Sequence, residues 1–415
     1  MPPDLRECCS ECTIYGDDFG NPFKQILLLI PHNTVVRDII VAISVYHQAR
    51  ASVACPPAAT PDLKSSLVKA ELQPNSIDYA TVMAHAYRAT CSLRSALSSE
   101  DCSDAIVASS FLFTWLDMLD TEVPSWHHHL AGMKDLMCLR ENKHASASTA
   151  KSVFHGFFRE AYAMYVQHLP ALLSQLPKVR AVGLVKWSDK DNARISIFGS
   201  TLSKAKIDPV RELPQFEVSA VLQRAQSWSW VGCPAELIGI LHALNGLQSH
   251  VQEPSQKDVE SILTRLENFS CSDWALHFPG KDLHKQRLHM ASAYKGAIAI
   301  YASHALRAHC ENPPFKLVGD MVDLALHHLK QISPSDSHFK GILWPAFILG
   351  AEARLPEQRL WIANALEQLY GMIHMWNIKR GLSVLQQLWA RPLPTYDRTS
   401  WLEEVYDMDE KLMLI

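Results

Sequence analysis

The residues from 341 to 389 constrain the fold more than any other part of this 415-residue chain, because they carry consecutive apolar stripes at helical spacing. Trp361, Ala365 and Leu369 recur every four positions. The adjoining row holds Ile362, Leu366, Tyr370 and Ile373. Such a spacing puts the whole set on one broad face of a helix. The pattern predicts a helix packed on its neighbours, with Trp361 in the core.

The next stripe runs through Leu382, Leu385, Leu388 and Trp389. Pro392 and Pro394 should end that helix, because proline has no amide donor and clashes with the preceding turn. Convincing alternation of the strand type is absent. We therefore predict an all-α fold, a large array of antiparallel-packed amphipathic helices in one extended domain. Similar stripes occur at 24–50, 79–98, 104–119, 126–139, 151–173, 217–230, 235–250, 284–308, 316–330 and 339–353.

The domain organisation follows from where these stripes lie. We expect a flexible N-terminal stub at 1–20 and one helical domain at 21–415. The segment near 181–199 is the exception, and it is compatible with a hairpin or with an irregular insertion between helical halves.

Composition excludes several classes of protein. Hydrophobic residues make up 48% of the chain and the net charge is −4, so a large core can form and no broad basic field exists. A free-standing nucleic-acid binder is disfavoured. No segment approaches the ~20 apolar residues that span a bilayer, and the start of the chain lacks the pattern of a secretion signal. We expect a protein that is not secreted, with reduced cysteines.

Metal and catalytic motifs are missing from the sequence. Of the ten cysteines, only Cys8, Cys9 and Cys12 lie close together. A binuclear zinc cluster needs six clustered thiolates, so no such cluster and no structural zinc are expected. No two of the 20 histidines are three or four positions apart, the spacing that places two imidazoles on one helical face. Signatures of serine hydrolases, of phosphate or dinucleotide binding and of zinc proteases are likewise absent, and we expect no cofactor.

Five sequence blocks together resemble the fungal-specific transcription factor regulatory domain. In the last block, a W-P-x-F-I-x-G-x-E-A segment precedes P-E-Q-R-x-W and a helix that opens N-x-x-R and ends on Trp. A second block has the pattern W-x-x-H-L-x-G-x-x-x-L. The blocks keep the family order over nearly the whole chain, at 21–50, 104–137, 231–247, 293–306 and 341–389.

The resemblance implies a regulator of transcription that senses a signal and contacts other proteins. The chain has no six-cysteine cluster of the kind that usually precedes this domain. We therefore expect a regulator of a fungal secondary-metabolite gene cluster that acts without its own zinc-cluster module, through other regulators or a homodimer. By analogy it would be nuclear; a cytoplasmic location is the alternative. The alternative function is the same scaffold redeployed as a cofactor-independent enzyme or small-molecule binder.

Candidate site residues come from the blocks that most resemble the family. Bulky rings on neighbouring helices pack as core or line a pocket for an apolar molecule. His129 and Asp117 are the weak catalytic candidates, although His129 suits a core position and Asp117 a solvated helix end. The predicted pocket lining consists of Phe111, Trp115, Trp126, His129 and Trp344.

Overall fold

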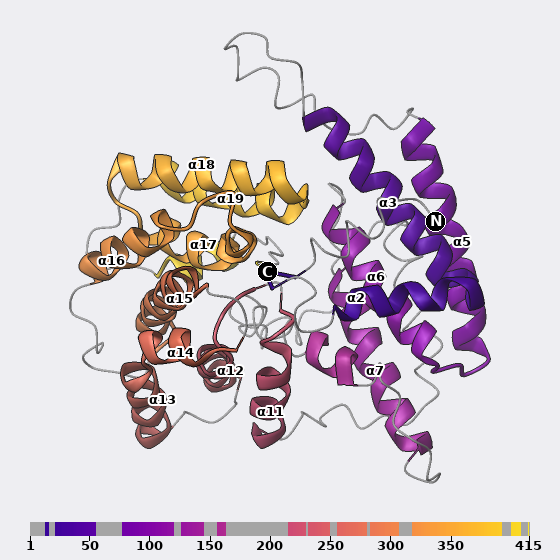
Figure 1. Cartoon of the computed structure of the whole chain (residues 1–415), viewed down its shortest axis with the longest axis horizontal. Coiled ribbons are helices and arrows are strands. Elements are labelled where there is room, and N and C mark those ends of the chain that lie inside the picture. Colours follow the sequence, from indigo (N-terminus) through magenta and orange to yellow (C-terminus); the bar gives the residue numbers. More distant parts are fainter. Residues whose placement is uncertain are drawn as a thin grey trace.

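The computed structural model of the chain is shown in Figure 1. It describes residues 13–15, 21–54, 77–119, 126–144, 156–162, 215–229, 231–249, 255–279, 283–306, 318–391, 400–407 and 414. Every regular element within these ranges is a helix and none is a strand, which confirms the all-α prediction. The expected insertion near 181–199 lies outside the described residues.

The N-terminal helices form one side of the molecule, coloured indigo to magenta in Figure 1. Helix α3 packs on both α5 and α6, and α6 packs on α7. This group comprises α2 (Pro22–Ile26), the 3-10 helix η1 (Leu27–His32), α3 (Thr34–Ala54), α5 (Ile77–Ser98), α6 (Asp104–Leu119) and α7 (Trp126–His144).

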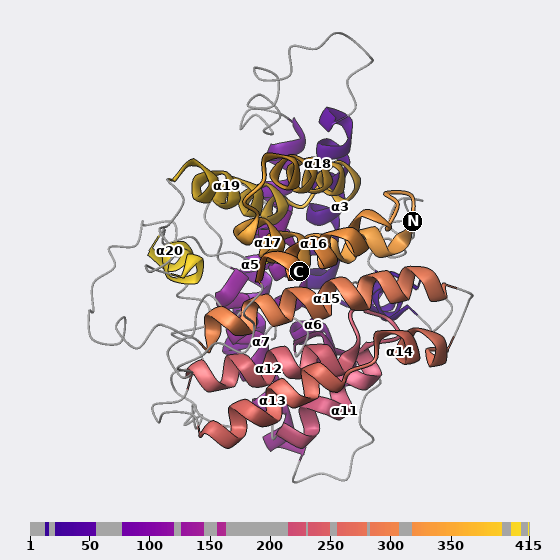
Figure 2. The same ribbon diagram turned by 90° about the vertical axis from the view of Figure 1, so that its left-hand side faces the viewer.

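The C-terminal helices form the other side around α15, which packs on α12, α14, α16 and α17. Figure 2 shows α13, α12 and α15 as successive layers, and contacts join each layer to the next. This group comprises α11 (Gln215–Ala225), α12 (Ala235–Ser249), α13 (Gln256–Asn268), α14 (Cys271–His277), α15 (His284–Ala305), α16 (Val318–Lys330), η3 (Ser337–Ile342), α17 (Leu343–Glu352), α18 (Pro356–Ile373), α19 (Trp376–Ala390) and α20 (Trp401–Asp407).

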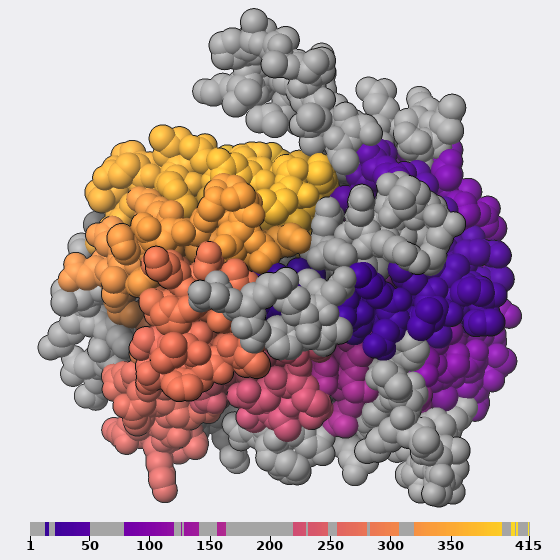
Figure 3. Space-filling model, in the orientation of Figure 1, coloured from indigo at the N-terminus to yellow at the C-terminus, as the bar shows by residue number. Residues whose placement is uncertain are grey.

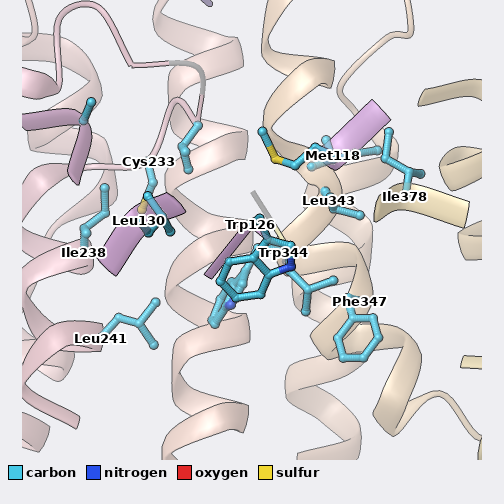
Figure 4. Packing of buried hydrophobic residues seen from close by; sticks show 14 of the residues in the cluster. Met118, Trp126, Leu130, Cys233, Ile238, Leu241, Leu343, Trp344, Phe347 and Ile378 are labelled. Atoms are coloured by element: carbon cyan, nitrogen blue, oxygen red, sulfur yellow. The ribbon is translucent and has the colours of Figure 1, made fainter. Parts of the chain in front are cut away.

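One continuous set of buried apolar side chains runs through both groups. Helix α6 contacts α19 across the junction, where Met118 and Ile378 are both buried. Their side chains appear in the same packed region in Figure 4, and the space-filling view of Figure 3 shows the two groups in close contact. A shared core of this kind removes apolar surface of both groups from water and holds them together.

The helix boundaries differ from the sequence prediction at 24–50. The single stripe is divided into α2, η1 and α3, because Asn33 begins a new helix. Its side-chain oxygen accepts hydrogen bonds from the amides of Val35 and Val36 at 2.9 and 3.1 Å. Pro31, inside η1, has no amide to donate to a continuous α-helix.

Three helices of the C-terminal group were missed from the sequence, α13, α14 and α20. Helix α13 has only a narrow apolar row, formed by Val259, Ile262 and Leu266, and its other residues are mostly polar. A search for broad apolar stripes therefore does not detect it. The sequence nevertheless contains the N-cap residue of α13, Ser255. In the structure its hydroxyl oxygen accepts a hydrogen bond from the amide of Asp258 at 3.2 Å.

The closing block 341–389 forms η3, α17, α18 and α19, and α19 ends at Ala390 as the two prolines predict. Gly350 permits the close approach of α17 and α19, because a Cβ there would lie 2.7 Å from Cδ1 of Leu385. The indole of Trp389 donates a hydrogen bond to the Gly350 carbonyl at 2.8 Å. These contacts explain the glycine and the final tryptophan of the block.

Part of the expected flexible stub is buried in the C-terminal group. The Ile14 amide donates to the Ser229 carbonyl at 3.2 Å, and the Tyr15 ring stacks on Phe278 with centroids 4.9 Å apart. Residues 13–15 therefore pack against the body of the protein, which the sequence analysis did not expect. The other residues of 1–20 lie outside the described ranges.

The expectation that Trp361 is a core residue is wrong. Its side chain is only partly buried, and the Lys330 ammonium lies 5.9 Å from the ring centroid. Trp344 is the core tryptophan of the block, with 2% of its surface exposed.

We expect Trp344→Ala to lower the free energy of unfolding by roughly 3–5 kcal/mol, because it removes a fully buried indole. Trp361→Ala, its matched control in the same block, should cost less than about 2 kcal/mol because water already reaches part of the ring. Urea unfolding followed by circular dichroism measures both. Equal losses for the two variants would contradict the packing described for this block.

Candidate functional site

The site predicted from the sequence starts with an aromatic cluster on α6. Phe111 and Trp115 are both buried, and their ring centroids lie 6.1 Å apart. Phe23 of α2 packs against Trp115, with the ring centroids 5.3 Å apart. Phe157, from a helical segment at 156–162, meets Phe111 edge-on at 5.8 Å. The geometry brings these two predicted residues together as members of a tightly packed aromatic core.

Asp117 and His129 form a buried ion pair between α6 and α7. His129 Nε2 lies 3.5 Å from Asp117 Oδ2, and the two residues are 7% and 8% exposed, respectively. The imidazole also stacks on Phe113 with centroids 5.1 Å apart. The sequence placed Asp117 at a solvated helix end, and this was wrong: α6 turns the carboxylate inward, where the α7 histidine offsets its desolvation.

Trp344 of α17 belongs to a different arrangement of rings. It stacks on Tyr294 of α15, with centroids 5.7 Å apart and planes 4° apart, and it meets Tyr301 edge-on at 6.3 Å. The Tyr294 hydroxyl donates to the Gly341 carbonyl at 3.0 Å, and the Tyr301 hydroxyl donates to Asn245 Oδ1 at 2.9 Å. Burial raises the pKa of both phenols, so they remain hydrogen-bond donors at neutral pH.

Trp126, the first residue of α7, is buried in the core. Figure 4 shows its indole with that of Trp344 in the middle of the packed region, with Leu130 and Cys233 to one side and Phe347 to the other. All five residues belong to the continuous core. The predicted lining residues thus belong to three arrangements: a pair of rings on α6, an ion pair between α6 and α7, and Trp344 with the two tyrosines of α15. Trp126 is buried in the same continuous core.

Sequence reasoning missed a polar cluster that joins α15, α17 and α20. His304 forms an ion pair with Glu352 through Nε2, and its Nδ1 lies 2.9 Å from the Ser400 hydroxyl oxygen. The Trp401 ring packs beside this pair, with its centroid 5.3 Å from that of His304. His304 and Glu352 lie in two of the family-like blocks, so their position in those blocks was the signal that could have found them.

Burial alone would raise the pKa of Glu352, but the hydrogen bond from His304 and the charge of that histidine outweigh it. The pKa of this carboxyl therefore lies below its ordinary value. Since the folded state binds this proton less tightly than the unfolded chain, the pair stabilises the protein above the unfolded pKa, and this stabilisation is lost as pH falls through the folded pKa.

A second buried carboxylate ties the 156–162 segment to α11 and the turn after it. Glu160 accepts hydrogen bonds from Arg224 Nε at 2.7 Å and from the Trp228 indole at 2.9 Å. The rings of Trp228 and Phe157 lie 5.1 Å apart. This contact connects the α6 aromatic cluster to the C-terminal group.

The described ranges hold neither a three-ligand metal centre nor a membrane-spanning helix. Among the described residues, no three or more His, Cys, Asp or Glu side chains lie in positions from which they could hold one metal ion. Among those same residues, no helix is long and apolar enough to cross a membrane.

We expect Glu352→Gln to reduce stability near pH 7, with the difference from wild type narrowing as pH falls below about 4.3, the ordinary glutamate pKa. The narrowing follows because protonation removes the same charge that the substitution removes. Urea unfolding at a series of pH values from 3 to 7 measures it. Glu357→Gln, at the exposed start of α18, is the matched control. A wild-type advantage that stays constant over this range would contradict the role given to the carboxylate.

The comparisons with known proteins agree on one family. The model of the fungal specific transcription factor domain matches residues 5–415. The acriflavine sensitivity control protein acr-2 of Neurospora crassa is 22% identical over 358 residues, covering 79% of this chain and 54% of that protein. The phomenoic acid biosynthesis cluster-specific transcriptional regulator of Leptosphaeria maculans is 23% identical over 312 residues, covering 71% of this chain and 53% of that protein.

No solved structure shows a significant match. The chain spans about half the length of the curated relatives it matches. Because the family model covers nearly every residue, in agreement with the five blocks of the sequence, the chain belongs to the family of the fungal specific transcription factor domain.

Proposed function

We propose that these 415 residues are the regulatory part of a transcriptional regulator, acting on the genes of a secondary-metabolite cluster. The family match across residues 5–415 is the observation that carries the proposal. The relative from Leptosphaeria maculans supports its finer part, because its name describes a regulator specific to a biosynthesis cluster. Such a role places the protein in the nucleus.

We further propose that these residues do not read promoter DNA themselves and act through contacts with another regulator, with which they associate alone or as a homodimer. The net charge of −4 supports this, because a protein gains affinity for DNA mainly by neutralising phosphates and releasing counterions. The cysteine spacing of these residues supports it too, since no six thiolates are clustered for two zinc ions.

A gene deletion in the source organism tests the regulatory role. We expect transcripts of neighbouring biosynthetic genes to fall in the deletion strain and to recover when the wild-type gene is restored. A complementing Trp344→Ala gene should fail or recover weakly, because loss of a buried indole depletes the folded protein. Unchanged neighbouring transcripts, in a strain that lacks the protein, would contradict control of that gene cluster.

A mobility-shift assay tests the part played by DNA. The purified chain should bind promoter and scrambled duplexes equally weakly at 150 mM salt, because its net charge of −4 gives little release of counterions from DNA. Discrimination of tenfold or more between the two duplexes would show that the chain itself reads DNA.

A second function, an enzyme or small-molecule binder without cofactor, is favoured by one observation. Asp117 and His129 form an acid–base pair in apolar surroundings next to the predicted aromatic lining. A group of this kind can move a proton if an apolar substrate reaches it. A regulator would instead use the same region to bind a metabolite and shift a conformational equilibrium.

Incubation of the pure protein with intermediates of the neighbouring pathway separates these functions. Saturable binding without product, weakened in Trp115→Ala, is the result we expect of a sensor. Turnover that His129→Gln abolishes, in a variant with a wild-type circular dichroism spectrum, would instead establish the enzyme. Phe339→Leu, in the C-terminal core away from the α6 aromatic cluster, is the control for general loosening of the fold.

A further inference from the structure

Three histidines gather where α15 packs on α16, well outside the site described above. His289 projects from α15, and His327 and His328 project from α16. His289 and His328 are half-buried, whereas His327 is exposed. The sequence criterion of two histidines on one helical face could not find this group, because its members come from two helices.

The backbone around the cluster is held at a close helix-to-helix distance. A Cβ on Gly296 of α15 would lie 2.7 Å from the Cβ of Ala325 on α16, so these two small residues set the spacing. They lie one to two turns along their helices from His289 and His328. The imidazoles therefore project from a scaffold whose separation is fixed by packing, as a preorganised site requires.

The geometry of the rings suits a shared ligand. Nδ1 of His289 and Nδ1 of His328 face each other at 3.0 Å, with centroids 5.3 Å apart. Two imidazole nitrogens on one tetrahedral zinc ion, each bonded at about 2.0–2.1 Å, lie roughly 3.3 Å apart. The hydrogen-bonded pair becomes two ligands of one ion when the N–N distance grows by a few tenths of an ångström, the rings turn slightly, and the Nδ1 proton of the donor ring moves through solvent to its Nε2. The exposed His327 ring lies 5.7 Å from the His328 ring, centroid to centroid, at the edge of the pair.

The electrostatics keep these rings in the form that binds metals. Burial lowers the pKa of His289, and the charges of His327 and Lys285 lower it further. Burial also lowers the pKa of His328, followed by the effect of His289 and then His327. Both imidazoles are therefore neutral at pH 7, and protons do not compete with a metal ion for their lone pairs.

The neighbouring charges are few and mostly engaged elsewhere. Lys285 opposes a dication, but its side chain is exposed and water screens it. On α16, Asp323 accepts a hydrogen bond from Gln358 at 2.7 Å, and Lys330 lies over the Trp361 ring. With no carboxylate supplied by these contacts, the donor set is imidazole nitrogen, which suits zinc, nickel and copper and not magnesium or calcium.

We propose that His289 and His328 form an exchangeable binding site for a zinc-like divalent ion, completed by water. The site is independent of the regulatory role proposed above and of any thiolate cluster. Because its ligands come from two helices, bound metal cross-links α15 to α16 and stabilises the folded state.

Calorimetric titration of the purified, metal-stripped chain with zinc chloride at pH 7.5 tests the proposal. We expect one site, a rise in melting temperature of about 2 °C at ten times the Kd, and affinity that weakens as pH falls below about 6.5. His289→Ala and His328→Ala should each weaken binding by roughly tenfold or more, and His327→Ala by less.

The matched control is His277→Ala, which replaces an exposed histidine of α14. This variant should bind zinc like wild type. His289→Gln and His328→Gln retain a polar side chain, so they report on ligation if an alanine variant folds poorly. Zinc binding and zinc-induced stabilisation that survive unchanged in folded His289→Gln and His328→Gln would overturn the proposal, because the ion would then bind elsewhere on the chain.

Discussion

The arrangement of the C-terminal group depends on the burial of α15 on nearly all of its faces. Its small and aromatic residues are buried around most of the circumference, from Met290 to Ala305. A helix that is apolar all round cannot rest on a surface and must be enclosed by other helices. Helices α12, α14, α16 and α17 each cover part of it, and the layers outside them pack on those four. The stacked tyrosine and tryptophan at the centre, Tyr294 and Trp344, mark where this enclosure is tightest.

Several buried charges in the described ranges pair with side chains of another helix. Asp117 meets His129 between α6 and α7, and Glu160 meets Arg224 and Trp228 between the two groups. Each carboxylate loses hydration on burial, and the partner helix must be in register to offset that loss. Such pairs add little to the net free energy of folding, but they penalise other packings of the same helices.

The polar cluster of His304, Glu352 and Ser400 also joins different elements of the fold through a largely buried ion pair, and it helps to position α20. It attaches the short helix α20 to the α15–α17 core, with Trp401 buried beside it. A seven-residue helix has little stability of its own, so its position depends on these contacts. The C-terminal end of the described structure is therefore sensitive to the protonation of one buried carboxylate, whereas the layers around α15 depend on apolar burial.

The sequence by itself determined the all-α class and the place of most helices, because these follow from local spacing, prolines and caps. It did not reveal the short or narrowly apolar helices α13, α14 and α20. It also indicated the family, because the five blocks keep their order over nearly the whole chain. It did not determine which aromatic residue is central: Trp361 has the more regular stripe, yet Trp344 is enclosed while Trp361 lies beneath Lys330. Nor did it show that Asp117 faces His129, or that His289 faces His328, 39 residues further along. Only the tertiary structure decided these pairings, because they depend on how helices distant in sequence dock, and no local pattern carries that information.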